Sequence, residues 1–284
     1  MLDASCAEQC SGAWTVVSED WLGKTCVVTG AASGIGAATA RQLKAHGAQV
    51  IALDRTAPGG DCADLFIEFD QGDPSSIERA CDKIELSVDA LLNIAGVPPT
   101  KNIEPAELLF INFFGLRFLT EKLAPRIRAG GAVVNMSSHA GWRWRENARR
   151  LAHFLNLRRK QEIAQAVSDI GVVTDGLGDL SAYPLSKQLI NLWTTQSPLS
   201  DGFGGLRMNA ISCAGVATPI LDDFLASFGE ESSARIRSIG LACPEDIAPT
   251  LVFVASPAAR WIRGAVIPVD GGASAVGFTK ALGL

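Results

Sequence analysis

Short apolar runs of strand length alternate with longer amphipathic segments along most of the chain. In the first such unit, an apolar run at 25–29 precedes a helical pattern at 37–46 and a second run at 49–54. Apolar runs separated by helices are typical of βαβ units, whose parallel strands are covered on both faces. Further buried strands are predicted at 65–69, 90–94, 132–136, 206–211 and 265–269. We therefore expect an α/β fold with a doubly wound sheet of about seven parallel strands and helices on both faces.

The same pattern predicts the domain organisation. Residues 1–23 are mostly small and polar, with one apolar patch at 14–17, and are interpreted as an N-terminal extension. Residues 24–284 contain no internal repeat, low-complexity tract or Pro/Gly-rich linker. We therefore expect a single domain over 24–284.

Composition and charge narrow the class of ligand. The chain has 284 residues, of which 48% are hydrophobic and 19% charged, so it can bury a substantial core and does not have the composition of a disordered protein. Its net charge of −5 provides no positive field to attract nucleic acid or an anionic membrane surface. We predict a small-molecule ligand, with neither nucleic acid nor membrane as a partner.

Cysteine and histidine usage argues against metal chemistry. The seven cysteines include no CxxC pair, and the three histidines are dispersed, so no metal site is predicted. The first residues lack a basic segment followed by an apolar one, and no stretch of about 18 apolar residues occurs. We expect reduced thiols in a cytoplasmic protein.

A glycine-rich turn follows the first predicted strand. Three glycines at this place permit a tight turn, approach of the backbone to a pyrophosphate, and close packing of helix on strand. The N-terminus of the helix that follows then favours anionic phosphates. An ordinary βα turn is the alternative, but strand, glycines and helix follow in the order that a Rossmann-type dinucleotide site needs. The candidate phosphate-binding residues are Gly30, Ser33, Gly34, Ile35 and Gly36.

Asp54 closes the second strand, about twenty residues after the turn. A carboxylate there accepts hydrogen bonds from the adenosine ribose hydroxyls and repels a 2′-phosphate, which favours NAD over NADP. The neighbouring Arg55 works against this preference, and a turn-capping role for Asp54 is the alternative.

The spacing Thr-Gly-x3-Gly-x-Gly resembles the short-chain dehydrogenase/reductase family, and the resemblance extends over about 24–272. Its other elements follow in the family's order: Asp70 after the third strand, Asn93-Ile94-Ala95-Gly96, Ile111-Asn112-Phe113-Phe114-Gly115, Val133 to Ser138, Tyr183-Pro184-Leu185-Ser186-Lys187, and Val269-Asp270-Gly271-Gly272. The resemblance implies that Asp70 contacts adenine and that Val216 and Thr218 contact the nicotinamide carboxamide. It also adds Asn93, Ala95 and Gly96 to the cofactor-binding residues, although Ile94 replaces the second Asn of that element.

Four residues are candidates for catalysis. Tyr183 and Lys187 are four positions apart, so on a helix they lie on one face, where the ammonium and a cationic nicotinamide stabilise a phenolate. The resemblance implies that Tyr183 exchanges the proton of the alcohol, Ser138 orients the substrate oxygen, and Lys187 also holds the nicotinamide ribose. Asn112 would hold a water that links Lys187 to solvent. Taken singly, each residue has an ordinary structural alternative: a solvated helix face, a strand-end turn or a helix cap.

The chain departs from the family pattern after the sixth strand. Cys213 and Ala214 stand where the family usually has Pro-Gly, near the nicotinamide. The methyl group of Ala214 is expected to affect the fit of the ring or substrate. No basic partner for Cys213 is evident in the sequence, so we interpret it as a small buried residue rather than a nucleophile.

An insertion separates two of the catalytic candidates. Ser138 and Tyr183 are 45 positions apart, far more than the family commonly shows, which places an insert at about 141–180. It is predicted to be helical over 144–167, with an apolar stripe of Trp144, Ala148, Leu151 and Leu155 and a basic solvated face. Because the ends of the insert flank the catalytic residues, we expect a lid or an altered subunit contact.

The insertion is accompanied by three short motifs: Asn93-Ile94-Ala95-Gly96-Val97-Pro98, Thr218-Pro219-Ile220-Leu221 and Arg260-Trp261-Ile262-x-Gly264. Together they resemble the branch of the family that contains bacterial 3α-hydroxysteroid dehydrogenase/carbonyl reductase and coniferyl alcohol dehydrogenase. The segment after Thr218 supplies apolar side chains for a substrate pocket, with a core role as the alternative: Ile220, Leu221, Phe224, Leu225 and Phe228. The sequence thus predicts an NAD-dependent oxidoreductase acting on a hydrophobic cyclic or aromatic alcohol or ketone of the hydroxysteroid, terpene or aryl alcohol type. The expected assembly is a homodimer or homotetramer.

Two alternatives stay open. A dihydrodiol or quinol-forming dehydrogenase of the same family would carry the same motifs. A regulatory protein that binds NAD without turnover would share the fold, because fold does not dictate function. The presence of Asn112, Ser138, Tyr183 and Lys187 together favours an enzyme.

Overall fold

The computed structural model describes residues 21–199, 203 and 205–283. Residues 1–20 of the predicted extension lie outside this range. Trp21, which follows them, is 1% exposed and packs in the core with Leu43 and Val50.

Seven parallel strands form one sheet in the order β3-β2-β1-β4-β5-β6-β7. The prediction of a doubly wound sheet of seven strands is therefore confirmed. The strands are β1 (Thr25–Thr29), β2 (Gln49–Asp54), β3 (Leu65–Glu68), β4 (Val88–Asn93), β5 (Ile127–Ser138), β6 (Arg207–Cys213) and β7 (Val266–Val269).

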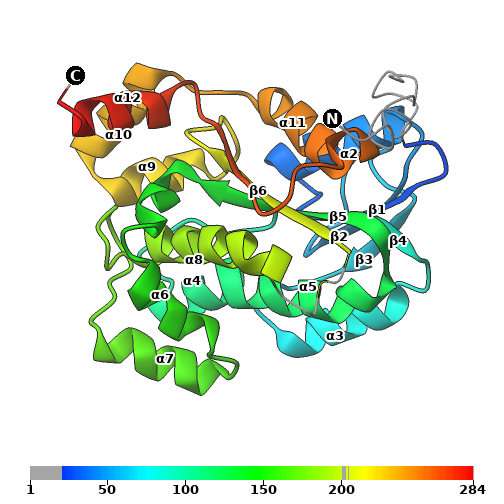
Figure 1. Cartoon of the computed structure of the whole chain (residues 1–284), viewed down its shortest axis with the longest axis horizontal. Coiled ribbons are helices and arrows are strands. Elements are labelled where there is room, and N and C mark those ends of the chain that lie inside the picture. The colour runs from blue at the N-terminus through cyan, green and yellow to red at the C-terminus, as the bar shows by residue number, and fades with distance from the viewer. Residues whose placement is uncertain (1–20, 200–202, 204, 284) are drawn as a thin grey trace, which may run out of the picture.

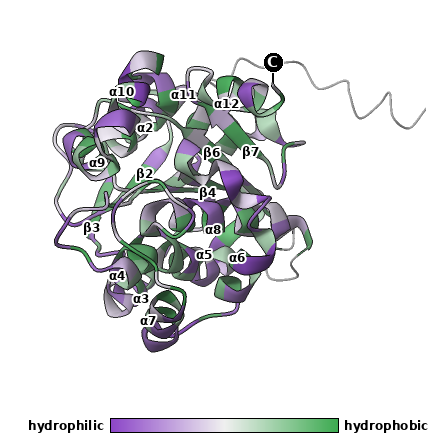
Figure 2. Ribbon diagram, turned by 90° about the vertical axis from the view of Figure 1, so that its left-hand side faces the viewer, coloured by the Kyte–Doolittle hydropathy of each residue, from purple (hydrophilic) through white to green (hydrophobic). Residues whose placement is uncertain are grey.

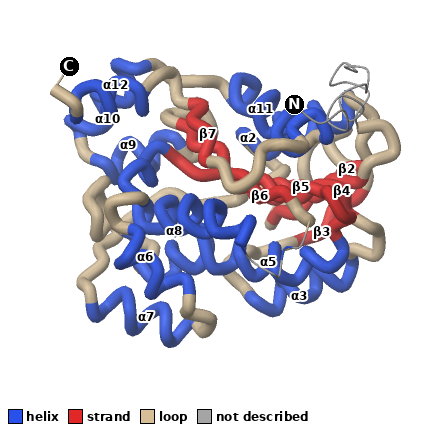
Figure 3. The backbone as a smooth tube through the Cα atoms, in the orientation of Figure 1, coloured by secondary structure: helices blue, strands red, loops and turns tan. Residues whose placement is uncertain are grey.

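Helices cover both faces of the sheet, and the core is divided accordingly (Figures 1 and 3). One face carries α2 (Gly34–Ala45) and α11 (Pro244–Ala255). The other carries α3 (Pro74–Lys83), α4 (Pro105–Leu109), a π-helical turn (Phe110–Gly115), α5 (Leu116–Leu123) and α8 (Ala182–Gln196). Neighbouring strand residues alternate between the two sides, so Val27 packs with the second group and Val28 with the first. Strands buried on both faces explain the continuous apolar runs in the sequence.

The carboxyl ends of the strands form one edge of the sheet, where the chain reverses its direction of winding between β1 and β4. Ligands of doubly wound sheets bind at such a switch point. Three further helices lie at this end of the molecule: α9 (Leu221–Phe228), α10 (Glu230–Ile239) and α12 (Ala273–Ala281).

The insert contains two helices rather than one: α6 (Ala148–Leu155) and α7 (Lys160–Asp169). The helix expected over 144–167 is interrupted because α6 ends at Leu155, with Asn156 as its C-cap. The helix α7 then begins with a capping box, in which Glu162 accepts from the backbone N–H of Arg159. Trp144 and Leu151 are buried in the core that also holds α8, and Figure 2 shows hydrophilic residues on the outer turns of α6 and α7. The apolar stripe is thus part of the core.

Arg117 on α5 anchors the end of α6. Its guanidinium is buried, donates to the carbonyl oxygens of Leu155 (2.9 Å) and Leu157 (2.5 Å), and lies over the ring of Phe114 at 5.2 Å. Burial lowers its pKa to about 10. The carbonyls at the end of a helix have no partner within the helix, so a charged donor is stabilising there.

We expect Arg117→Met to lower the free energy of unfolding by about 2–3 kcal/mol, because buried charged hydrogen bonds are lost. Urea unfolding measures this loss. Arg158→Met is the matched control, since Arg158 donates to the same two carbonyls from a side chain that is 57% exposed. Its effect should stay below about 0.5 kcal/mol. Equal losses in the two variants would contradict the anchoring role of Arg117.

Candidate active site

A cavity of about 900 Å³ lies at the carboxyl edge of the sheet. It extends from the turn after β1, past the ends of β2, β4, β5 and β6, to α9 and α10. Of the predicted site residues, all but Asn93 and Asn112 line it. The cavity therefore joins the candidate cofactor residues to the candidate catalytic residues.

The glycine-rich turn forms one end of the cavity. A Cβ on Gly36 would lie 2.0 Å from the carbonyl oxygen of Gly30, and one on Gly30, whose φ is +69°, would lie 3.0 Å from the backbone of Ala95. Thr29 ties the turn to the neighbouring strand, because its hydroxyl oxygen accepts from the N–H groups of Ile94 and Ala95, both at 2.9 Å. The helix α2 begins at Gly34 and directs its free N–H groups into this end of the cavity. This cradle fits the pyrophosphate of a dinucleotide.

Two carboxylates line the same end. Asp54 ends β2, and its side chain accepts from the N–H of Ala32 at 2.9 Å and of Thr56 at 3.3 Å. Asp70 follows β3, and its side chain accepts from the N–H of Gly72 at 2.8 Å. Asp54 is thus held by the glycine-rich turn and by its own loop, and Asp70 by its own loop, which supports fixed positions for hydrogen bonds to a nucleoside.

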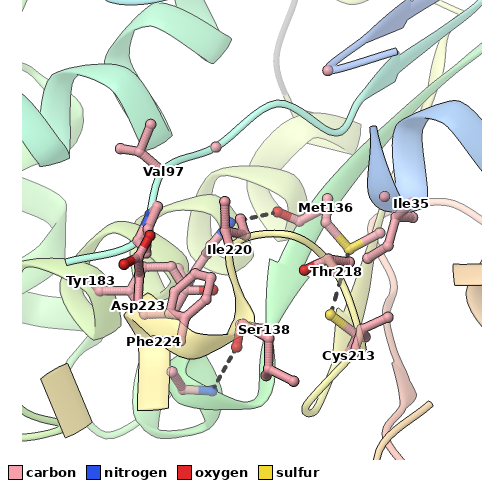
Figure 4. Close-up of a pocket in the computed structure, with 18 of the residues that line it drawn as sticks. Ile35, Val97, Met136, Ser138, Tyr183, Cys213, Thr218, Ile220, Asp223 and Phe224 are labelled. Carbon is pink, nitrogen blue, oxygen red and sulfur yellow. Dashed lines mark hydrogen bonds between the residues drawn. The ribbon is translucent and has the colours of Figure 1, made fainter. Parts of the chain in front are cut away.

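Tyr183 and Lys187 lie one turn apart on α8. Ser138, at the end of β5, lines the same cavity as Tyr183 (Figure 4). Lys187 Nζ lies 5.4 Å from the centre of the Tyr183 ring and donates to the carbonyl oxygen of Met136 at 3.0 Å. The Ser138 hydroxyl accepts from the N–H of Ala140 at 3.2 Å. Cys213 and Ala214 also line the cavity beside them, where the sequence placed them.

Burial is the main cause of the pKa shifts of Tyr183, Lys187 and Cys213. It raises the pKa of the Tyr183 phenol well above its ordinary value, against the opposite effect of the Ser138 hydrogen bond. It lowers the pKa of the Lys187 ammonium to about 8 and raises that of the Cys213 thiol. Without a ligand the phenol is thus neutral at physiological pH, and a further positive charge is needed to stabilise a phenolate.

Asn112 does not line the cavity. It lies in the π-helical turn, is 1% exposed, and its side-chain amide pairs with the backbone of Val97: Oδ1 accepts from N–H at 2.8 Å and Nδ2 donates to the carbonyl at 3.0 Å. A Cβ on Gly96 would lie 3.2 Å from Asn112 Oδ1 and 3.9 Å from Lys187 Nζ. Glycine at position 96 therefore keeps open the space between the amide and the ammonium.

Asn93 was expected among the cofactor-binding residues, but its side chain lies elsewhere. It is fully buried, and its amide donates to Thr120 Oγ1 and to Asn135 Oδ1, both at 2.9 Å. The pleat of β4 turns this side chain toward α5 and β5, so it joins strand to helix, and only the backbone that follows it reaches the cavity.

The apolar wall of the cavity comes from the segment after Thr218 and from the two ends of the insert. All five predicted residues of this segment line the cavity, and the rings of Phe224 and Phe228 lie 4.8 and 5.9 Å from that of Tyr183. Trp142 and Leu177 add to this wall from the insert, whereas α6 and α7 contribute no lining residue. No local motif marks these two residues as part of a site, although their places near the ends of the insert were a signal for them.

The fold and this cavity define a dinucleotide-dependent oxidoreductase. Residues 24–148 match the short chain dehydrogenase family, and residues 160–274 match the family described as enoyl-(acyl carrier protein) reductase. Coniferyl-alcohol dehydrogenase of Pseudomonas sp. (strain HR199 / DSM 7063) is 35% identical, with 88% of this chain and 96% of that protein covered. The 3-alpha-hydroxysteroid dehydrogenase/carbonyl reductase of Comamonas testosteroni is 29% identical, with 88% and 96% covered.

A solved structure agrees with these relatives. The 3-alpha-hydroxysteroid dehydrogenase from Pseudomonas sp. B-0831, complexed with NADH, superimposes with a TM-score of 0.72 at 27% identity, covering 90% of this chain and 99% of that one. The chain belongs to the short-chain dehydrogenase/reductase family. It is an enzyme of the alcohol dehydrogenase class that uses a nicotinamide cofactor. Within the part of the chain that the structure describes, no helix is long and apolar enough to span a membrane.

The ionisation of Tyr183 can be followed by itself, since it is the sole tyrosine of the chain. In the folded protein without cofactor, we expect no phenolate absorbance up to pH 10, because burial raises the pKa of the phenol. The denatured chain should titrate with a midpoint of about 10. Since the unfolded chain then releases a proton that the folded protein retains, this group lowers stability as the pH rises above about 10. Half-ionisation of the folded protein at or below pH 10 would refute this expectation.

Proposed function

We propose that the chain catalyses the NAD-dependent interconversion of a hydrophobic cyclic or aromatic alcohol and its ketone or aldehyde. One observation carries the proposal: a single cavity joins the glycine turn and Asp54 to Ser138, Tyr183 and an apolar wall. Its two ends thus match the two partners of a hydride transfer, a dinucleotide and an apolar alcohol.

Each residue of the reacting end has a part in this proposal. Tyr183 takes the proton of the alcohol in oxidation and returns it in reduction, because its phenol is an acid/base group that lines the cavity together with Ser138. Ser138 orients the substrate oxygen. The ammonium of Lys187, 5.4 Å from the Tyr183 ring, favours the phenolate and contributes to cofactor binding. The nicotinamide, when bound, accepts or supplies the hydride and in its oxidised form adds positive charge.

The buried Lys187 needs a path for protons. The space that Gly96 leaves between Lys187 Nζ and Asn112 Oδ1 supports a relay through water, with Asn112 held by the backbone of Val97. In this proposal Asn112 binds the relay water without lining the cavity itself, which is consistent with its burial.

Asp54 supports NAD rather than NADP. Its side chain lines the cavity at the end of β2, where it would accept from ribose hydroxyls and repel a 2′-phosphate. The structural relative complexed with NADH is consistent with this preference. The apolar wall around Phe224 supports a ring-bearing substrate, in line with the alcohol and steroid named for the two relatives.

We expect kcat/KM to be about a hundredfold higher with NAD than with NADP, because like-charge repulsion at Asp54 costs a few kcal/mol. Asp54→Asn removes the charge and should reduce the ratio to about tenfold or less. Asp70→Asn, a change of the other carboxylate in the same end of the cavity, is the control and should keep the wild-type ratio. Equal or better kcat/KM with NADP in the wild type would contradict the assignment.

Tyr183→Phe should lower kcat by about two to four orders of magnitude and leave the dissociation constant for NADH nearly unchanged. The reason is that the substitution removes the hydroxyl but keeps the ring packed against Phe224 and Phe228. Steady-state kinetics on an alcohol substrate and NADH fluorescence titration measure the two quantities. Wild-type kcat in this variant would overturn the role of Tyr183. Cofactor binding without turnover of any alcohol or ketone by the wild type would favour a non-catalytic protein instead.

A further inference from the structure

His139 follows Ser138 directly and lines the same cavity, but the proposed reaction does not use it. Its ring is held from a distant part of the chain. His139 Nδ1 lies 3.3 Å from Ser274 Oγ and 3.7 Å from Asp270 Oδ2, on the segment that runs from β7 into α12. Because Ser138, Cys213 and Val269 are neighbours in the sheet register, this contact reaches across the end of β6.

The hydrogen bonds around Ser274 determine which nitrogen of His139 carries the proton. The Ser274 hydroxyl donates to Asp270 Oδ2, which also accepts from the Ser274 N–H at 2.9 Å. The other carboxylate oxygen accepts from the N–H of Gly272 at 3.1 Å. With its proton directed to Asp270, the Ser274 oxygen is an acceptor toward His139, so Nδ1 carries the hydrogen. In the neutral ring, Nε2 is then an unprotonated acceptor.

The surroundings favour the neutral ring. Burial lowers the pKa of His139; Arg235 acts in the same direction, and Asp270 acts against it. Within the described residues no protein group is hydrogen-bonded to Nε2. His139 lines the cavity, and its side chain is 26% exposed. Beside Ser138, the cavity thus offers a hydrogen-bond acceptor that is oriented by Ser274 and Asp270.

We propose that His139 Nε2 accepts a hydrogen bond from a second hydroxyl group of the substrate, so that the enzyme prefers diols over the matching mono-alcohols. This inference rests on the proposed function, because it concerns the alcohol that Ser138 and Tyr183 bind. Ser274 and Asp270 are positioning residues, which act by holding the ring and its tautomer. A mono-alcohol would leave the acceptor without a partner once water is excluded, which is why such a site discriminates.

A carboxylate substituent is the competing occupant. Arg235 lines the cavity close enough to affect the charge of His139, and a guanidinium would pair with an anion. The bare Nε2 would repel a carboxylate as long as the ring is neutral, whereas it accepts readily from a hydroxyl. The structure therefore favours the diol, and the experiment includes the hydroxy acid.

The experiment compares kcat/KM for cyclohexanol, the cis and trans isomers of cyclohexane-1,2-, 1,3- and 1,4-diol, and 4-hydroxycyclohexanecarboxylate. We expect at least one diol to exceed cyclohexanol by about tenfold in the wild type, the value of one well-formed hydrogen bond. His139→Phe should abolish this ratio, and His139→Gln, which retains an acceptor oxygen, should keep part of it. Ser274→Ala should reduce the ratio, and Ser274→Thr, which retains the hydroxyl, should preserve it.

His153→Phe is the matched control, because His153 is exposed on α6 and does not line the cavity. It should keep the wild-type activity and the wild-type ratio. If no diol exceeds cyclohexanol, or if His139→Phe keeps the ratio, the inference is wrong. The inference would also be overturned if the wild type preferred the hydroxy acid over the diols and the Arg235→Gln variant lost that preference.

A second measurement does not depend on turnover. With only three histidines in the chain, nitrogen NMR of the ¹⁵N-histidine-labelled protein can assign His139 by comparison with His139→Gln. We expect a spectrum of the Nδ1–H tautomer, and a shift of the Nε2 signal when diol, but not cyclohexanol, is added to the complex with NADH. An Nε2–H tautomer, or equal shifts with both alcohols, would refute the inference. Failure of the proposed function can be distinguished from failure of this inference. In the first case the wild type would oxidise none of the alcohols, whereas the NMR response to the diol is measured without turnover.

Discussion

The site depends above all on the packing of α8 against β5. Polar contacts join the two elements at successive levels: Asn135 donates to Thr194 at 3.0 Å, the Ser137 hydroxyl donates to the Lys187 carbonyl at 3.4 Å, and Lys187 Nζ donates to the carbonyl of Met136. The backbone after β5 then passes so close to α8 that a Cβ on Gly141 would lie 2.9 Å from Lys187. Since Ser138 and Tyr183 come from these two elements, their relation depends on this packing. All of these groups are buried, so a lost partner would leave an unsatisfied polar group in the core.

The sheet edge connects this packing to the cofactor end. Asn93 and Asn135 bridge β4 to β5, and Thr29 binds the backbone that follows β4. Gln71, which is buried and lines the cavity, donates to the carbonyls of Ala95 and Ile111, which links the same backbone to the π-helical turn. The glycine turn, the Gly96 segment and the reacting end are thus held by buried side chains, of which Thr29, Asn93 and Asn135 do not line the cavity. This explains why polar residues recur at the ends of strands whose interiors are apolar.

The insert changes the wall of the cavity without covering it. Its helices α6 and α7 bury Leu151 and Ile163 in the core shared with α8, and Arg117 holds the end of α6. Only Trp142 and Leu177, near its two ends, reach the cavity. Of the two expectations for the insert, a lid is not supported for α6 and α7, which contribute no residue to the cavity, and an altered subunit contact stays a prediction. An apolar stripe of this size gains more free energy in a continuous core than at a solvated pocket mouth.

Much of the fold and site was determined by local sequence. Strands buried on both faces read as continuous apolar runs, and the glycine turn, Asp54 and the Tyr183–Lys187 pair each depend on residues close together in the chain. Tertiary structure decided what depends on side-chain direction and long-range contact. The pleat of β4 directs the Asn93 side chain away from the cavity. The apolar stripe of the insert packs in the core rather than at the mouth of the cavity. The contact between His139 and Ser274 joins residues 135 positions apart, and no local pattern encodes it, because only the neighbouring ends of β5, β6 and β7 bring them together.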